Sequence, residues 1–165
     1  MKILIASDIH GSARYCQKLI ADFHAENADT LLLLGDILDG NREVAAMLNE
    51  LKKLILCVKG NCDYPADQAL LGFPILAEYC LLYAGNKRIF AAHGNRAIPS
   101  LTSNDIYLHG HTHVPTWDTS MDYIELNPGS VSEPRLGSTH SYMILNENGF
   151  VWKDLNGQKY HEMKL

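Results

Sequence analysis

The chain has 165 residues, a formal net charge of −5 and no lysine and arginine cluster longer than Lys52-Lys53. This length suits one domain, and 47% hydrophobic with 20% charged residues is the mix of an ordinary globular protein. The acidic balance argues against nucleic-acid binding, because phosphate neutralisation needs a basic face. No apolar run approaches the roughly 20 residues of a membrane span, so we expect no membrane association.

The N-terminus and the cysteines predict a cytoplasmic protein. The apolar run at the N-terminus is too short for a signal peptide and meets Asp8 at once. The four cysteines show no CxxC spacing and lie in or beside apolar runs: Cys16, Cys57, Cys62 and Cys80. We therefore expect free thiols in a reducing compartment.

The first half of the chain predicts alternating strands and helices. Short runs of apolar and β-branched residues indicate buried strands at residues 2–7, 30–34 and 54–58. Apolar side chains recur at helical spacing over residues 12–27 and 43–51. The strand–helix–strand order predicts right-handed crossovers and a parallel sheet with helices packed on it.

After Asp63 the pattern changes to short strands and tight turns. Residues 64–72 fit a short helix or a loop, and hairpin turns are predicted at Gly85-Asn86 and at residues 146–149. The strands expected here are residues 79–84, 88–92, 106–108, 114–118, 123–126, 140–145 and 150–155. We predict mostly antiparallel pairing in this half. The whole chain, residues 1–165, is then one α/β domain, a sandwich of two mixed sheets flanked by helices.

Polar clusters follow five of the predicted apolar runs. They are Asp8 and His10, Asp36 and Asp39, Asn61 and Asp63, His93, and His111 and His113. Ligands in open α/β sheets bind beyond the carboxyl ends of strands, so neighbouring strands would bring these clusters to one rim. Carboxylate, imidazole and amide donors suit Mn²⁺, Fe²⁺, Zn²⁺, Ni²⁺ or Co²⁺, and the lack of a thiolate set argues against structural zinc. There are too many donors for one ion, which indicates two ions roughly 3.5–4 Å apart, as in sites that hydrolyse phosphoesters.

Each cluster alone has a simpler explanation. Asp8 and Asp36 could cap a helix or form a turn, and Asp39 before Gly40 is a typical turn residue. Asn61 could also be a turn residue, and His93 a buried, hydrogen-bonded histidine. These explanations do not account for every cluster lying at the same end of a strand. We therefore favour the metal site.

The same segments resemble a known family. Asp8-Ile9-His10, Gly35-Asp36-Ile37-Leu38-Asp39, Gly60-Asn61-Cys62-Asp63, His93-Gly94 and Gly110-His111-Thr112-His113 resemble, in order, the five signature blocks of calcineurin-like metallophosphoesterases. The small size and residues 127–135 resemble the YfcE-type branch, single-domain phosphodiesterases of bacteria and archaea. The resemblance spans nearly the whole chain and implies a β-sandwich flanked by helices.

This resemblance implies two ligand sets. The first is Asp8, His10, Asp36 and His113, and the second is Asp36, Asn61, His93 and His111. A hydroxide bridging two divalent ions would attack phosphorus in line with the leaving oxygen, while the ions neutralise phosphoryl charge. We favour Mn²⁺, and Ni²⁺, Zn²⁺, Fe²⁺, Co²⁺ or Mg²⁺ are also compatible. Asp63 and Asp39 would orient a ligand such as His10 or Asn61.

Cys62 departs from the family pattern, in which most members carry a histidine thought to protonate the leaving group. A thiol, with a reference pKa of roughly 8.5, is a poorer acid. The YfcE-type branch shares this cysteine. We expect catalytic roles for Asn61, Cys62 and His93 and a preference for diesters with good leaving groups. A purely space-filling role for Cys62 stays open.

The sequence indicates the residues that contact the substrate less clearly than it indicates the metal ligands. Asn95 and Arg96 follow His93-Gly94 and could contact a substrate phosphate, although a solvated loop is the simpler explanation. Arg135 could bind phosphate through two parallel hydrogen bonds. The expected partner is a small phosphoester, without nucleic acid or membrane, and relatives imply a homo-oligomer.

Four classes of function are compatible with these motifs. A metal-dependent phosphodiesterase is favoured because every ligand position is filled. A non-catalytic scaffold, like the metallophosphoesterase-fold subunit of the retromer coat, would tend to lose ligating histidines. The acidic charge disfavours a nuclease of the same superfamily. A phosphomonoesterase or protein phosphatase is disfavoured by Cys62 and by the short chain, which leaves little material for a cap over the site.

Overall fold

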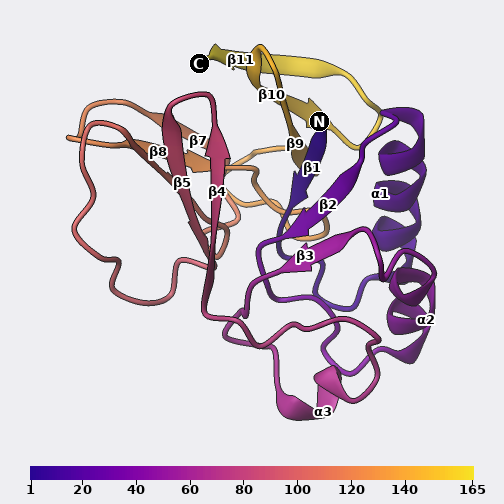
Figure 1. Ribbon diagram of the computed structural model, residues 1–165. Coiled ribbons are helices and arrows are strands. Elements are labelled where there is room, and N and C mark those ends of the chain that lie inside the picture. The colour runs from indigo at the N-terminus through magenta and orange to yellow at the C-terminus, as the bar shows by residue number, and fades with distance from the viewer.

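The alternation predicted for the first half is confirmed in the computed structural model, which describes residues 1–165. Strands β1 (Ile3–Ala6), β2 (Thr30–Leu33) and β3 (Ile55–Cys57) pair in parallel, as Figure 1 shows. Helices α1 (Ala13–Ala25) and α2 (Arg42–Glu50) connect them. A four-residue helix, α3 (Pro65–Gln68), lies in the segment predicted as a short helix or a loop.

The second half forms eight strands. They are β4 (Tyr79–Ala84), β5 (Lys87–Ala92), β6 (Asp105–Leu108), β7 (Thr116–Asp118), β8 (Ile124–Asn127), β9 (Ser141–Asn146), β10 (Gly149–Asp154) and β11 (Lys159–Lys164). Both predicted hairpins are present, joining β4 to β5 and β9 to β10. Pairing is mostly antiparallel, but β6 pairs in parallel with both β5 and β8. Strand β11 was not predicted, because this edge strand carries charged residues and has no continuous apolar face.

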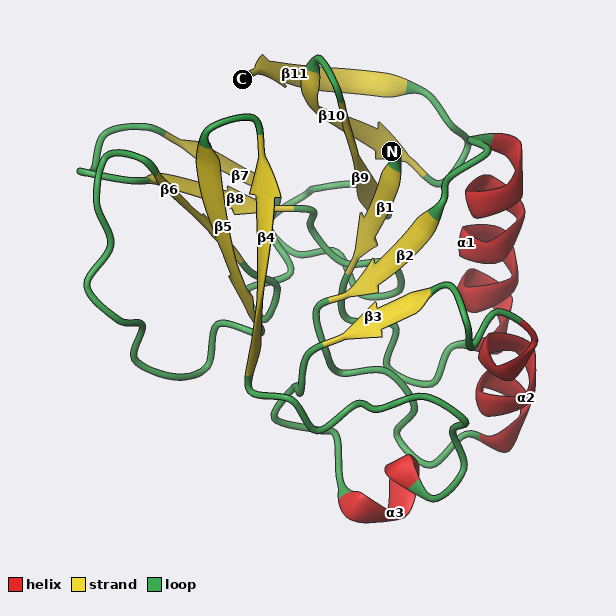
Figure 2. Ribbon diagram, in the orientation of Figure 1, coloured by secondary structure: helices red, strands yellow, loops and turns green.

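The strands form two sheets. The six-stranded sheet has the order β11-β10-β9-β1-β2-β3, and the five-stranded sheet has the order β4-β5-β6-β8-β7. Helices α1 and α2 cover the outer face of the six-stranded sheet, whose inner face packs on the five-stranded sheet (Figure 2). No helix covers the outer face of the five-stranded sheet (Figure 2). The molecule therefore has one helix layer and two sheet layers.

Side-chain alternation in the central strands builds a core on each face of the six-stranded sheet. Leu4 and Leu31 belong to the core cluster under the helices, whereas Ile5 and Leu32 belong to the cluster between the sheets. Successive strand side chains point to opposite faces, so a strand buried on both faces reads as a continuous apolar run. Burial of one leucine or isoleucine side chain stabilises the fold by about 1.5–3 kcal/mol.

The helices are short, and local sequence sets where they begin. The Asn41 side chain caps α2, because its Oδ1 accepts hydrogen bonds from the amides of Glu43 (2.8 Å) and Val44 (3.3 Å). Ser12 occupies the corresponding position of α1 without a side-chain cap bond. No helix is long and apolar enough to cross a membrane.

Candidate metal centre

The five predicted polar clusters meet at one rim of the sandwich. They follow β1, β2 and β3, which are parallel in one sheet, and β5 and β6, which are parallel in the other. Backbone hydrogen bonds join the loops, since the Asp8 amide donates to Gly35 O (3.1 Å) and the Gly110 amide to His93 O (2.9 Å). Residues more than a hundred positions apart therefore share one site.

One group of candidate ligands consists of Asp8, His10 and His113. One donor atom of each lies within 4.8 Å of the others. His113 Nε2 is 3.2 Å from Asp8 Oδ1 and 3.4 Å from His10 Nε2. Asp8 and His113 are buried, and His10 is half-buried. This group has the composition of the first ligand set apart from Asp36.

A second group consists of Asp36, His93 and His111, with donor atoms again within 4.8 Å of one another. His93 Nε2 lies 3.0 Å from Asn61 Oδ1. The His111 amide donates to Asp8 Oδ2 (3.0 Å), which ties this group to the first. The Asn61 amide oxygen therefore lies beside this group.

Asp36 lies between the two groups. Its Oδ2 is 3.3 Å from His93 Nε2 and 3.7 Å from His10 Nε2. Its other carboxylate oxygen accepts a hydrogen bond from the Cys62 amide (2.7 Å). Asp36 is thus the one carboxylate with an imidazole nitrogen of each group within 4 Å.

Hydrogen bonds donated by Nδ1 fix the orientation of three imidazole rings. Nδ1 of His93 donates to Leu34 O (2.7 Å) and Nδ1 of His113 to Glu133 O (2.7 Å). Nδ1 of His10 lies 3.1 Å from Asp39 Oδ2 and donates to this carboxylate. In each neutral ring the lone pair is then on Nε2, the arrangement usual for a metal-bound histidine.

These Nε2 lone pairs point at other electron donors. His10 Nε2 faces His113 Nε2, and the buried Asp8 Oδ1 beside them has no hydrogen-bond partner. Buried acceptors that face one another repel unless a cation or a proton lies between them. The donor set therefore fits divalent metal ions.

The backbone is strained at the site. Eight residues other than glycine have positive φ, and six of them are predicted ligands or supporting residues: Asp8, His10, Asp36, Asp39, His111 and His113. Their φ values lie between 43° and 63°. Such left-handed conformations cost of order 1 kcal/mol each and cluster at functional sites. The surrounding fold holds the loops in place against this cost.

Asp63 supports the Asp36 loop. Its buried carboxylate accepts the amides of Asp36 (2.9 Å), Ile37 (2.9 Å) and Gly60 (2.7 Å). The partners are therefore backbone amides rather than the side chains of His10 or Asn61 that the sequence analysis predicts. Burial raises the pKa of Asp63, and the three amide hydrogen bonds oppose that rise. Gly60 is required there, because a Cβ atom would overlap the Asp36 carboxylate.

The electrostatics keep Asp36 ionised. Burial acts to raise its pKa, but the His93 ring, the Cys62 amide and the nearby His10 lower it to about 2. Burial acts to lower the pKa of His93, and Asp36 reverses this into a net rise. Burial and the His93 charge lower the pKa of His111. Asp36 is thus a carboxylate throughout the neutral range.

Cys62 lies at the half-exposed edge of the site. Its Sγ accepts a hydrogen bond from Asn61 Nδ2 (3.2 Å). Cys62 also forms a third group of possible metal ligands, together with His10 and Asp39. Burial, together with the charges of Asp36 and Asp39, raises the pKa of the Cys62 thiol to about 11. The thiol is therefore protonated at neutral pH.

The three substrate-contact candidates lie around the site. Asn95 and Arg96 are exposed in the loop after His93, and Arg96 Nη1 forms an ion pair with Glu78 Oε2 (3.2 Å). Arg135 is exposed and its amide donates to His113 O (3.3 Å). The Asp8 carboxylate raises the pKa of His113, and the Arg135 charge opposes that rise. Arg135 is therefore close enough to act on the first ligand group.

Asn127, which was not predicted as a site residue, supports the histidine loop. This buried side chain donates from Nδ2 to Gly110 O (2.8 Å) and to Thr112 Oγ1 (3.0 Å). The hydroxyls of Ser130 and Ser132 donate to Asp8 O at 2.9 and 3.1 Å. The available signal was the polar run at residues 127–135, but nothing in the sequence shows which loop it contacts.

Comparisons with known proteins agree with this geometry. Residues 1–149 match the family model of the calcineurin-like phosphoesterase superfamily domain. The chain is 36% identical to phosphodiesterase YfcE of Escherichia coli K12, over 96% of this chain and 94% of that protein. The solved structure of YfcE, a phosphoesterase from E. coli, superposes with a TM-score of 0.92 at 32% identity, covering 99% of both chains. Wild-type Vps29 from Entamoeba histolytica, crystallised with Zn²⁺, has a TM-score of 0.70 at 23% identity over 99% of each chain, a likeness of fold alone.

Proposed function

Because this chain belongs to the calcineurin-like phosphoesterase superfamily and is a phosphoesterase of the YfcE type, we propose that it hydrolyses phosphodiesters with two divalent metal ions. The observation that carries the proposal is the set of imidazoles whose Nδ1 atoms are hydrogen-bonded while their Nε2 atoms converge on carboxylates. Such a set has little use in a protein that binds no cation.

The residues fit two adjacent ions that share one ligand. Asp8, His10, Asp36 and His113 would hold the first, and Asp36, Asn61, His93 and His111 the second. Bound there, the ions would lower the pKa of a water molecule and neutralise charge on the phosphoryl oxygens. We favour manganese, although this donor set also accepts nickel, zinc, iron, cobalt or magnesium.

The remaining side chains position these ligands and serve the leaving group. Asp39 orients the His10 ring, and the protonated thiol of Cys62 can donate its proton to the leaving oxygen. A thiol with a pKa of about 11 is a weak acid, so we expect esters with good leaving groups to react faster. Arg135, whose charge acts on His113, would attract a phosphoryl oxygen.

We further propose that residues 1–165 form one metallophosphoesterase domain. The family match ends at residue 149, but β10 and β11 beyond it extend the same six-stranded sheet. None of the four cysteines is paired, which supports a reducing compartment such as the cytoplasm.

A metal-reconstitution assay tests the function. Metal-stripped protein would be supplied with Mn²⁺, Ni²⁺, Zn²⁺ or Mg²⁺ and assayed on bis(p-nitrophenyl) phosphate. We expect hydrolysis that depends on added metal and is abolished in Asp36→Asn. Asp122→Asn, at an exposed acidic residue outside the site, is the matched control. A folded protein that takes up no metal, or full activity in Asp36→Asn, would contradict the proposal and favour a non-catalytic scaffold.

A further inference from the structure

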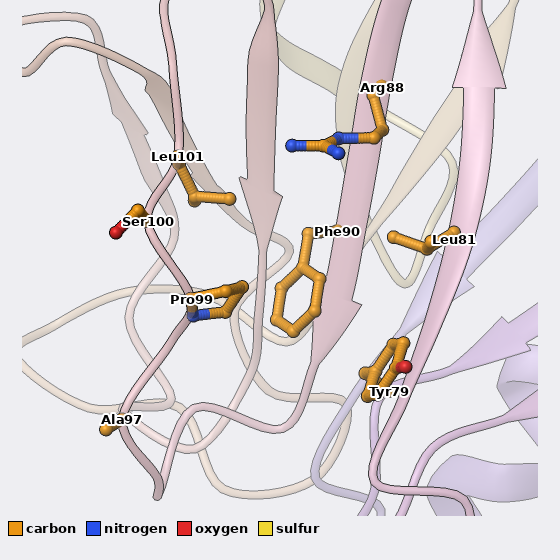
Figure 3. Close-up of a pocket in the computed structure, with 8 residues that line it drawn as sticks. All are labelled: Tyr79, Leu81, Arg88, Phe90, Ala97, Pro99, Ser100 and Leu101. Atoms are coloured by element: carbon orange, nitrogen blue, oxygen red, sulfur yellow. The ribbon is translucent and has the colours of Figure 1, made fainter.

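A groove of about 470 Å³ lies on the outer face of the five-stranded sheet, which no helix covers. Figure 3 shows its two walls, with Tyr79, Leu81 and Phe90 on the strands and Pro99 and Leu101 on the loop opposite. This volume lies within the range of small-molecule binding sites, roughly 300–1,000 Å³. The groove is therefore large enough for an organic group of moderate size.

The walls suit a flat ring. The rings of Tyr79 and Phe90 stack on each other with centroids 5.1 Å apart and planes inclined by 23°. Tyr79 is 54% exposed and Leu81 48% exposed, so this apolar surface faces solvent. An aromatic ring inserted between the aromatic pair and Pro99 would bury surface on both of its faces.

The groove continues toward the candidate metal centre. A smaller cavity of about 90 Å³, lined by His93 and the five residues after it, shares Tyr79, Phe90 and Ala97 with the groove. Tyr79 pairs with Ala92, the residue before His93. Phe90 lies three positions before His93, which is about 10 Å along a strand. The loop that follows His93 therefore lines both the smaller cavity and the groove.

Charges at the groove are paired within the protein. Arg88, at the end away from His93, donates from Nε and Nη2 to the carboxylate of Asp105 (2.8 and 2.9 Å). At the end near the metal centre, Arg96 is paired with Glu78 (3.2 Å). The groove thus favours an uncharged occupant, while the negative phosphate stays at the metal centre.

We propose that the groove binds an uncharged aromatic ring, such as a nucleobase, on one ester arm of the phosphodiester substrate. This inference rests on the proposed function and narrows its substrate class. A ring attached directly to the ester oxygen would stop near His93. A ring separated from phosphorus by a spacer the length of a sugar reaches Tyr79 and Phe90.

Two diesters with the same leaving group provide the test. The p-nitrophenyl ester of thymidine 5′-phosphate carries the ring and spacer, and p-nitrophenyl methyl phosphate lacks both. We expect Tyr79→Ala, and Ala97→Trp at the junction of the two cavities, to raise KM for the thymidine ester roughly 3- to 10-fold. KM for the methyl ester should be unchanged. Tyr83→Ala is the matched control, because Tyr83 is 66% exposed on the same strand and does not line the groove.

A binding measurement separates this inference from the proposed function. Thymidine added to metal-stripped protein should shift the methyl NMR signals of Leu81 and Leu101, and Ala97→Trp should remove the shifts. The inference would be wrong if thymidine caused no shifts, or if the variants changed KM equally for the two esters. Hydrolysis of the methyl ester would still support the proposed function in that case. If the metal-loaded wild-type protein hydrolyses neither ester, the proposed function is wrong. The NMR shifts on addition of thymidine would still show whether the groove binds an aromatic ring. A dimer that Tyr79→Ala dissociates without changing either KM would show that a second copy covers the groove, and would also overturn the inference.

Discussion

His93 Nε2 lies 3.3 Å from Asp36 Oδ2, so an imidazole that follows β5 in one sheet meets a carboxylate that follows β2 in the other. Nδ1 of His93 donates to Leu34 O, so in the neutral ring the Nε2 lone pair faces this carboxylate. The contact marks where one ion would bind.

Replacing His93 by alanine should remove one ligand of the second ion and leave the first ligand set intact. We expect the metal content of the purified protein to fall from two ions to about one. Diester hydrolysis should fall at least 100-fold, because even partners of metal ligands typically contribute 10- to 100-fold. Elemental analysis and kcat would be measured together, with the exposed His24→Ala as the control. An unchanged metal content would contradict the ligand assignment.

Asp39 should affect metal binding through His10. Asp39→Ala removes the acceptor of the His10 Nδ1 proton, and we expect roughly 10- to 100-fold weaker metal affinity. Asp39→Asn retains an oxygen acceptor and should restore most of that affinity. The measurement is titration of metal-stripped protein with Mn²⁺. Equal affinities of Asp39→Ala and wild type would show that the ring needs no such partner.

Because Cys62 is a weak acid, the rate of hydrolysis should depend strongly on the leaving group. Burial and the charges of Asp36 and Asp39 raise the pKa of the Cys62 thiol to about 11. Such a weak acid should give little general-acid catalysis when the leaving group is poor. Cys62→His should increase hydrolysis of alkyl monoesters relative to that of aryl diesters. Both substrates would be assayed with both proteins under the same metal. Equal activities of the two proteins on both substrates would leave Cys62 a space-filling role.

Asn127 should be required for the stability of the histidine loop. Asn127→Ala removes the buried amide that donates to Gly110 O and Thr112 Oγ1, a loss of about 1–3 kcal/mol in the free energy of unfolding. Denaturant unfolding of the metal-stripped protein measures this, with the exposed Asn156→Ala as the control. Metal affinity should fall as well, since His111 and His113 lie on this loop. If both quantities match wild type, Asn127 does not hold the loop.

Asp105 should make the free energy of unfolding depend on pH below about pH 4. The hydrogen bond from Arg88 lowers the pKa of Asp105 from 3.8 to about 2, against the opposing effect of burial. A lowered pKa stabilises the fold above the unfolded value near pH 4, and this contribution is lost as the pH falls toward 2. The stability difference between wild type and Asp105→Asn should be constant near neutral pH and narrow below pH 4. A difference that does not vary between pH 6 and pH 2.5 would contradict the ion pair.

The polar clusters could be found from the sequence because residue type and position at a strand end are both local features. Asp8, Asp36 and His93 each follow a continuous apolar run, and the parallel order of the strands brings such ends together. The partners of Asp63 could not be found in this way. Its hydrogen bonds go to backbone amides, which carry no residue-specific signal. The role of Asn127 and the strand β11 depend on which segments meet in space, and one sequence alone does not show that.

Each proposed ligand set takes residues from both sheets. Asp8, Asp36 and Asn61 follow strands of the six-stranded sheet, whereas His93 and His113 follow strands of the other. Bound metal would therefore cross-link the two layers, and neither layer separated from the other could retain an ion.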